Sequence, residues 1–212
     1  MIFTLSKSFR MTNKYLTFFE KKYGNAAKAS QTFHALQRIF TYLTTQLGNK
    51  TSFNIVLVDC LHRALDKNEQ VFLPHIFDEF FVVGGFGGRL ILSDADGERL
   101  KGLAEKLSDR VSLIEGDLVP NLHTIGQSLD EEIDVVYLGP SLTDMGKGTN
   151  PLATMKETLA IHGLTHGKTL VVCEEEEEDA GRHGTMQEFL SDGGDREIKP
   201  LIATEKIKGW VF

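Results

Sequence analysis

From residue 53 onward, short apolar runs alternate with longer stretches of helical periodicity, and this alternation constrains the fold more than any other feature of the sequence. Runs that are apolar throughout, and not only at every second position, are typical of strands buried on both faces of a parallel sheet. The helical stretches supply the crossovers that parallel strands need. Strands are predicted at residues 53–58, 89–93, 111–114, 133–138 and 168–173, with closing β stretches at 198–204 and 206–212.

Helix signals lie between these strands. Pro74 suits a first helical turn, Gly84 follows the end of the same helix, and Asp96 is a suitable N-cap for the next one. The predicted helices span residues 74–83, 96–107, 151–162 and 185–190. The sequence thus predicts a doubly wound α/β fold with a mostly parallel sheet.

Two amphipathic helices precede the first strand. Apolar side chains recur at helical spacing over residues 13–23 and 26–47, Asn13 can cap the first helix, and Gly24 and Gly48 follow the two ends. We therefore predict an N-terminal helical cap over residues 1–51 and a Rossmann-like domain over residues 52–212.

Charge is distributed unevenly along the chain. Residues 1–50 hold eight Lys and Arg and one acid, a net +7, whereas residues 51–212 hold 15 basic and 29 acidic residues, a net −14. Such an asymmetry predicts that the N-terminal segment meets an anionic surface. That surface can be the chain's own acidic domain, a partner subunit or a phosphate-bearing substrate.

The two cysteines, Cys60 and Cys173, lie in or next to apolar runs, where reduced thiols act as small hydrophobic side chains. This usage predicts a reducing, cytoplasmic setting. No run of about 18 apolar residues occurs, so no membrane-spanning helix is expected.

Acidic residues recur where the predicted strands end. Asp59 follows the first strand, Asp94 the second and Asp117 the third. Ligands of open parallel sheets bind beyond the carboxyl ends of the strands, and a carboxylate at the end of the second strand can accept hydrogen bonds from ribose hydroxyls. These positions predict a nucleoside-binding edge.

Four ordered segments carry a more specific signal. They read LILSDADGERL at residues 90–100, DRVSLIEGDL at 109–118, IDVVYLG at 133–139 and LTHGKTLVVCE at 164–174. In this order they resemble the core motifs of class I S-adenosylmethionine-dependent methyltransferases, and residues 206–212 are similar to that family's last antiparallel strand. The resemblance implies a seven-stranded sheet with S-adenosylmethionine over the carboxyl ends of the first four strands.

The resemblance also implies residue roles. Asp94 would bind the ribose and Ala95 would pack on the adenine. Asp117 would contact the adenine amine, and Leu138 and Gly139 would border the methionine end. The implied cofactor site also includes Gly116 and Leu118, which flank Asp117.

The sequence departs from the family pattern after the first strand. The family has an acidic residue followed by alternating glycines, whereas this chain reads DCLHRA at residues 59–64. In one interpretation the cofactor still binds through Asp59, Cys60 and backbone groups in a looser loop, and His62 or Arg63 meets the carboxylate of the methionine moiety. In the other, the site has decayed and the domain is a catalytically silent binding or scaffold partner. The later glycines at residues 84–88 lead directly into a strand, so they predict a helix stop and a sharp connection.

A general base is needed for methyl transfer only if the acceptor is protonated. His62 and Asp144, beyond the first and fourth strands, are the candidate catalytic residues. No metal site is predicted, because Gly163 is expected to end the helix between His162 and His166, so the two histidines do not lie on one helical face.

The predicted substrate is a small molecule. The domain is acidic, and the segment after the fourth strand lacks the two prolines and the aromatic residue usual in methylases of nucleic-acid amino groups, so nucleic acid is disfavoured as a partner. The N-terminal helices are expected to form a lid or a homodimer element. A different Rossmann-type nucleotide binder is a further alternative.

Overall fold

The computed structural model describes residues 9–47, 50–58, 72–116, 123–125, 132–138, 168–174, 199–204 and 207–211. The strands are β1 (Ser52–Val58), β2 (Gly87–Asp94), β3 (Val111–Glu115), β4 (Val135–Leu138), β5 (Leu170–Glu174), β6 (Lys199–Ala203) and β7 (Ile207–Val211). The helices are α1 (Asn13–Tyr23), α2 (Ala26–Thr41), the π-helical segment η1 (Tyr42–Gln46), α3 (Phe72–Val82) and α4 (Gly97–Ala104). The helices predicted at residues 151–162 and 185–190 lie outside the described residues.

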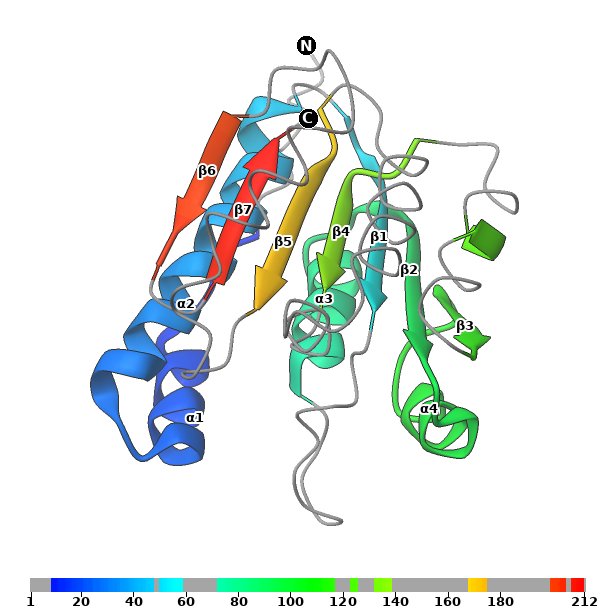
Figure 1. The fold of residues 1–212 in the computed structure, drawn as a ribbon, viewed down its shortest axis with the longest axis horizontal. Helices are drawn as coiled ribbons and strands as arrows, with labels where there is room; N and C mark the ends of the chain where they lie inside the picture. The colour runs from blue at the N-terminus through cyan, green and yellow to red at the C-terminus, as the bar shows by residue number, and fades with distance from the viewer. Residues whose placement is uncertain are drawn as a thin grey trace, which may run out of the picture.

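The strands form one seven-stranded sheet in the order β3-β2-β1-β4-β5-β7-β6 (Figure 1). The pairs β1–β2, β2–β3, β1–β4 and β4–β5 are parallel, and β7 is antiparallel to both β5 and β6. The predicted doubly wound, mostly parallel fold with seven strands is therefore confirmed, and its last strand is the antiparallel one.

The central strands are buried along their length because they are apolar on both faces. Residues 53–58 of β1 and all of β4 are buried, as are residues 90–93 of β2. Two strands start later than predicted. β5 begins at Leu170 because Lys168 has a positive φ of 93°, which turns the chain before the strand, and β4 begins at Val135 because the preceding residues form a bend.

Helices α1 and α2 match their predicted positions, with local differences. Gly24 adopts φ 57° and its N–H donates to the Glu20 carbonyl, as expected of a glycine that ends a helix. The predicted cap was wrong, because Asn13 is the first helical residue and Thr12 occupies the N-cap position without a side-chain hydrogen bond. The last turn of the second helix is π-helical, and the hydroxyls of Thr44 and Thr45 donate there to backbone carbonyls of the preceding turn.

An aromatic cluster joins the N-terminal helices to the sheet. The Phe80 ring stacks on Phe40 at 5.1 Å between centroids and on Phe86 at 4.6 Å, and it also contacts Phe9 and Phe53. These residues come from the N-terminal segment, α2, β1, α3 and the connection into β2, and all lie in or against one apolar core. The division into a cap at residues 1–51 and a domain at residues 52–212 stays a prediction.

Gly84 and Gly85 lie in the sharp connection between α3 and β2, as predicted, and Gly87 and Gly88 begin the strand. Gly85 has φ 68°, Gly88 has φ 110°, and a Cβ at Gly88 would overlap the backbone of Phe53 on the neighbouring strand. Glycine is required here because the two backbones approach too closely for any side chain. The loop at residues 59–64 lies outside the described residues.

Candidate functional site

The order of the strands defines where a ligand can bind. From β1 the chain continues to β2 and β3 on one side of the sheet, whereas β4 and β5 add on the other side of β1. The direction reverses between β1 and β4, and the crevice beyond the carboxyl ends of such a pair is the usual ligand site of doubly wound sheets. Figure 1 shows the arrowheads of β1, β2 and β4 at the same edge of the sheet. We call it the carboxyl edge.

Asp94 lies at this edge, as the sequence predicted for a residue at the end of the second strand. It is the last residue of β2, it is half-buried, and its Oδ1 accepts a hydrogen bond of 3.1 Å from the Asp96 N–H. Asp96 in turn caps α4, because its Oδ1 accepts from the Arg99 N–H at 3.1 Å. The predicted cap of this helix is therefore confirmed. Ala95 is exposed in the turn between Asp94 and the helix.

The end of β3 lies directly beside Asp94. Glu115 is the register partner of Asp94, and the N–H of Gly116 donates to the Asp94 carbonyl at 3.1 Å. Gly116 has φ 138°, a conformation that favours glycine. The structure thus brings Asp94, Ala95 and Gly116 together at the carboxyl edge.

Leu138 lies further along the same edge. It is the last residue of β4, it is fully buried, and it pairs with Val58 of β1 and Cys173 of β5. It therefore forms the floor of the edge at the point where the strand order reverses. Its aliphatic side chain contributes no polar group to a ligand.

Several predicted site residues are not among those that the structure describes. They are Asp59, Cys60, His62, Asp117, Leu118, Gly139 and Asp144. Their roles stay predictions. Within the described ranges, no group of three or more His, Cys, Asp or Glu side chains is arranged to hold a metal ion.

Two residues at the carboxyl edge were not singled out by the sequence. Gly97, the first residue of α4, is buried, and a Cβ placed on it would overlap the carboxylate of Glu115. Glu115 also raises the pKa of Lys101 through its charge, although the hydrogen bond and charge of Glu98 raise it more. A glycine at the first helical position is the one signal that could have indicated this contact.

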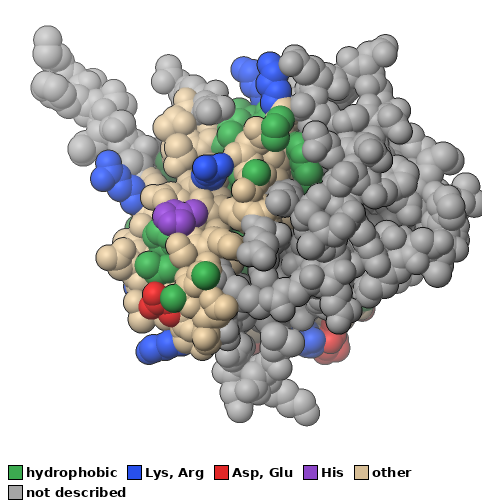
Figure 2. Space-filling view, turned by 60° about the vertical axis from the view of Figure 1, so that its left-hand side comes forward, with side chains coloured by type: hydrophobic (Ala, Val, Ile, Leu, Met, Phe, Trp, Pro, Cys, Tyr) green, Lys and Arg blue, Asp and Glu red, His purple; other side chains and the backbone are tan. Residues whose placement is uncertain are grey.

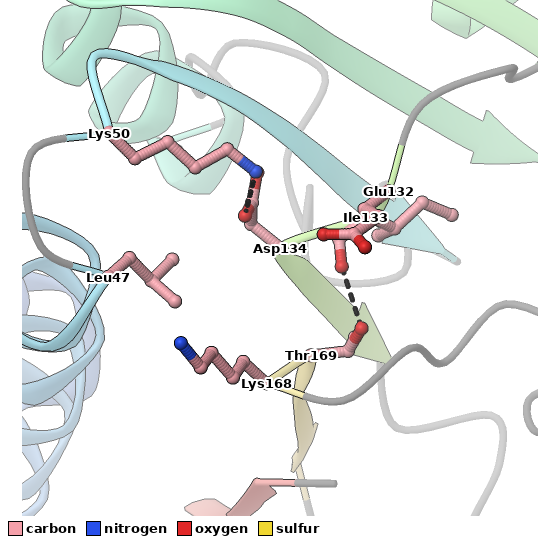
Figure 3. Close-up of a pocket in the computed structure, with 7 residues that line it drawn as sticks. All are labelled: Leu47, Lys50, Glu132, Ile133, Asp134, Lys168 and Thr169. Atoms are coloured by element: carbon pink, nitrogen blue, oxygen red, sulfur yellow. Dashed lines mark hydrogen bonds and ion pairs between the residues drawn. The ribbon is translucent and has the colours of Figure 1, made fainter.

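The opposite, amino edge of the sheet carries a second group of charged residues. Lys50 Nζ lies 2.5 Å from Asp134 Oδ1 (Figure 3). The other carboxylate oxygen, Asp134 Oδ2, accepts from the Asn54 N–H at 2.9 Å. Burial raises the pKa of Asp134 despite these bonds. With Leu47, Glu132, Ile133, Lys168 and Thr169, these two side chains line a hollow of about 150 Å³. Because it lies before β1, β4 and β5, it is remote from the carboxyl edge.

Part of the basic N-terminal segment pairs with the acidic remainder of the chain. Lys14 Nζ lies 3.0 and 2.9 Å from the two carboxylate oxygens of Glu79, and the Tyr15 hydroxyl donates to the same carboxylate. Lys50 pairs with Asp134 in the same way. Of the anionic surfaces considered for this segment, the acidic remainder of the chain itself therefore pairs with at least Lys14 and Lys50.

The remaining described Lys and Arg side chains on this flank stay apart from one another. Figure 2 turns the α1–α2 flank forward and shows single basic side chains separated by backbone and uncharged groups. Among the side chains that the structure describes on this face, the basic ones form no continuous stripe of the kind that tracks a nucleic-acid backbone. None of the described helices combines the length and the apolar character that crossing a bilayer requires.

A seven-stranded sheet in this order, with an antiparallel β7 between β5 and β6 and an acidic residue at the end of β2, defines the class I methyltransferase fold. Comparison with solved structures supports this assignment. The TehB-like S-adenosylmethionine-dependent methyltransferase from Corynebacterium glutamicum is similar at a TM-score of 0.53, with 11% identity over 94% of this chain and 99% of that one. The CMeT domain of the citrinin polyketide synthase is similar at a TM-score of 0.56, with 9% identity over 87% of this chain and 53% of that one.

Sequence comparison adds nothing beyond the fold. No protein-family model matches the chain, and no curated protein matches it significantly. At 9–11% identity, the structural neighbours establish the fold alone.

Proposed function

We propose that this protein is an S-adenosylmethionine-dependent methyltransferase that acts on a small molecule in the cytoplasm. The observation that carries the proposal is the half-buried carboxylate of Asp94, fixed at the end of β2 beside the strand reversal of a class I methyltransferase fold. A fold alone does not establish a function, and the chemistry of this edge therefore has to support the proposal.

The described residues of the carboxyl edge fit an adenosine without phosphates. Four acids lie there, Asp94, Asp96, Glu98 and Glu115, and the two neighbouring cations are paired, since Arg99 Nε is 3.8 Å from Asp96 and Lys101 Nζ is 2.8 Å from Glu98. Carboxylates accept hydrogen bonds from ribose hydroxyls and repel phosphate. This charge pattern supports S-adenosylmethionine over a nucleotide with a phosphorylated ribose.

In the proposed site, the chain binds and orients the two reactants. Asp94 accepts hydrogen bonds from the ribose, Ala95 packs on the adenine, and Leu138 closes the floor beneath the methionine end. When bound, S-adenosylmethionine supplies a methyl group already activated on a sulfonium, so positioning of the acceptor accounts for much of the acceleration. His62 or Asp144 would remove a proton from an acceptor that carries one.

The proposed role of the N-terminal helices is that of a lid or a dimer element. Figure 1 shows α1 near the level of the carboxyl ends of the strands, alongside α2, and the Lys14–Glu79 pair joins α1 to α3. The edge of the sheet formed by β6 is a poor dimer surface, because β6 contains Pro200 and Arg38 donates to the Leu201 carbonyl at 3.2 Å. Light scattering on the purified full chain distinguishes a monomer with a lid from a dimer.

Calorimetric titration of the full chain with S-adenosylmethionine and S-adenosylhomocysteine tests the proposal. Asp94→Ala should weaken binding by about 1–3 kcal/mol, or about 5- to 150-fold, through loss of charge-assisted hydrogen bonds. Glu98→Ala is the matched control, because it removes an equal charge from an exposed position on the adjacent helix. Absence of binding to the wild type near 1 mM ligand, a binding free energy of about −4 kcal/mol, would contradict the proposal and favour the catalytically silent partner.

A further inference from the structure

The turn from β2 into α4 presents Asp94 and Ala95 at the carboxyl edge, and three hydrogen bonds shape it. The Asp96 N–H donates to Asp94, the Arg99 N–H donates to Asp96, and the Leu100 N–H donates to the Asp96 carbonyl at 3.0 Å. The backbone of Asp94 pairs with β3, and Leu100 and Leu103 of α4 are buried in the core.

Glu115 supplies a contact from outside the turn. Its backbone pairs with Asp94 in the β2–β3 register, and its side chain reaches over the turn to Gly97, the first residue of α4. Gly97 is buried although its neighbours Glu98 and Arg99 are exposed, and a Cβ on Gly97 would occupy the place of the Glu115 carboxylate. The Glu115 carboxylate therefore occupies the space that a side chain at Gly97 would fill.

The Glu115 carboxylate lies beside the first residue of α4. The hydrogen bond and the charge of Glu98 raise the pKa of Lys101 most, and the charge of Glu115 adds to them. The adjoining backbone is fixed as well, since the Gly116 N–H donates to the Asp94 carbonyl. The end of β3 thus holds both the start and the end of the β2–α4 turn.

We propose that Glu115 is a positioning residue of the cofactor site: its carboxylate packs against Gly97 and holds the β2–α4 turn so that Asp94 and Ala95 face the ligand. The inference rests on the proposed function, because it concerns the geometry presented to S-adenosylmethionine. Glu115 acts through the turn, and Asp94 remains the group that binds the ribose.

Four variants test this role: Glu115→Ala, Glu115→Gln, Gly97→Ala and the double variant Gly97→Ala/Glu115→Ala. The readouts are the affinity for S-adenosylhomocysteine by calorimetry and the thermal midpoint without ligand. Glu115→Ala and Gly97→Ala should each weaken binding about three- to tenfold, because the first removes the carboxylate from its place against Gly97 and the methyl group of the second displaces it. Glu115→Gln has the same shape and should stay within about twofold of the wild type.

The double variant separates positioning from direct obstruction of the ligand by the new methyl group. The double variant should bind S-adenosylhomocysteine no more weakly than the single variant with the lower affinity, because both changes remove the same contact. Its thermal midpoint should equal or exceed that of Glu115→Ala, because alanine is the better helix former. A purely structural role would lower the midpoint and leave the affinity unchanged.

Three results would overturn the inference while leaving the proposed function intact: both single variants bind as the wild type does, their losses multiply in the double variant, or Glu115→Gln loses as much affinity as Glu115→Ala. A wild-type protein that does not bind S-adenosylhomocysteine would instead remove the proposed function, and the inference with it.

Discussion

Phe80 is the residue whose truncation should damage the fold most. Its side chain is fully buried on α3, and its ring contacts Phe9, Phe40, Phe53, Phe81 and Phe86, which belong to different parts of the chain. Because these partners are fixed in separate elements, they cannot collapse together to fill the space that Phe80→Ala would leave.

The magnitude follows from the burial and the ring contacts. A buried aromatic side chain removes about 150–250 Å² from water, worth about 4–6 kcal/mol at 25 cal/mol per Å². Alanine retains part of this area, and measured Phe→Ala costs run from about 3 to 5 kcal/mol. We expect a loss of about 4 kcal/mol in the free energy of unfolding for Phe80→Ala. This is a large share of the roughly 5–15 kcal/mol of a typical domain.

Phe81→Ala is the matched control. Phe81 is 1% exposed, and among the described residues Phe80 is the one aromatic ring that its own ring contacts, at 5.5 Å. Its truncation should cost about 1 kcal/mol less, the value of a favourable aromatic pair beyond area burial. Phe80→Leu, which keeps most of the volume, should cost about 1.5 kcal/mol and provides a measurement if the alanine variant does not fold.

Urea denaturation followed by circular dichroism and by fluorescence of Trp210 measures these losses. Trp210 is the single tryptophan, is buried on β7, and reports the sheet at the end far from β3. Equal losses for Phe80→Ala and Phe81→Ala would refute the view that the ring cluster, and not burial alone, stabilises this core. A loss below about 1.5 kcal/mol for Phe80→Ala would refute the estimate from burial.

Three further predictions concern other sites. Gly88→Ala should cost more than about 3 kcal/mol in the free energy of unfolding, because Gly88 has a positive φ and a Cβ there would overlap β1. Gly102→Ala, in open space on α4, should instead stabilise by about 0.5–1 kcal/mol. The two variants should therefore shift the urea midpoint in opposite directions. Burial raises the pKa of the Cys173 thiol to about 12, so in a Cys60→Ser background a disulfide reagent at pH 8 should react only with denatured protein, and a rapid native reaction would contradict the burial. Burial raises the folded-state pKa of Asp134 above its ordinary value of 3.8, so the contribution of Asp134 to stability is greatest below that pH and is lost as the pH rises through the folded-state pKa. The free energy of unfolding of the wild type, relative to that of Asp134→Asn, should therefore fall from pH 3.5 to pH 6. A rise over this range would show that Lys50 outweighs desolvation.

The candidate site was predictable where it depends on strand ends. Asp94 was found because a buried apolar run marks its own end and the next polar residue marks the edge. Gly116 was named only through the resemblance to the methyltransferase family, since β3 is not buried along its length. Glu115 and Gly97 were missed because their relation is spatial: one ends β3, the other begins α4, and no sequence period joins them.

Local differences from the predicted elements have local causes. The backbone turn at Lys168 and the π-helical turn at Tyr42–Gln46 interrupt patterns that are otherwise regular. The Tyr42 hydroxyl donates to the Lys168 carbonyl at 2.6 Å, so the two irregular segments hold each other. A bond between residues so far apart in the chain leaves no trace in hydrophobic periodicity.

Sequence patterns were enough to predict the order of the strands, the bounds of α1 and the class of sheet, because burial on both faces and helix-ending glycines act through nearest neighbours along the chain. The helix predicted at residues 96–107 ends earlier, at Ala104. The pairing of particular cations with particular acids, as in Lys14–Glu79 and Lys50–Asp134, and the contact of the Glu115 carboxylate with Gly97 are seen only in the folded structure. Charge and shape complementarity act across space between segments that the chain brings together only on folding, and that is why a pattern read along the sequence does not contain them.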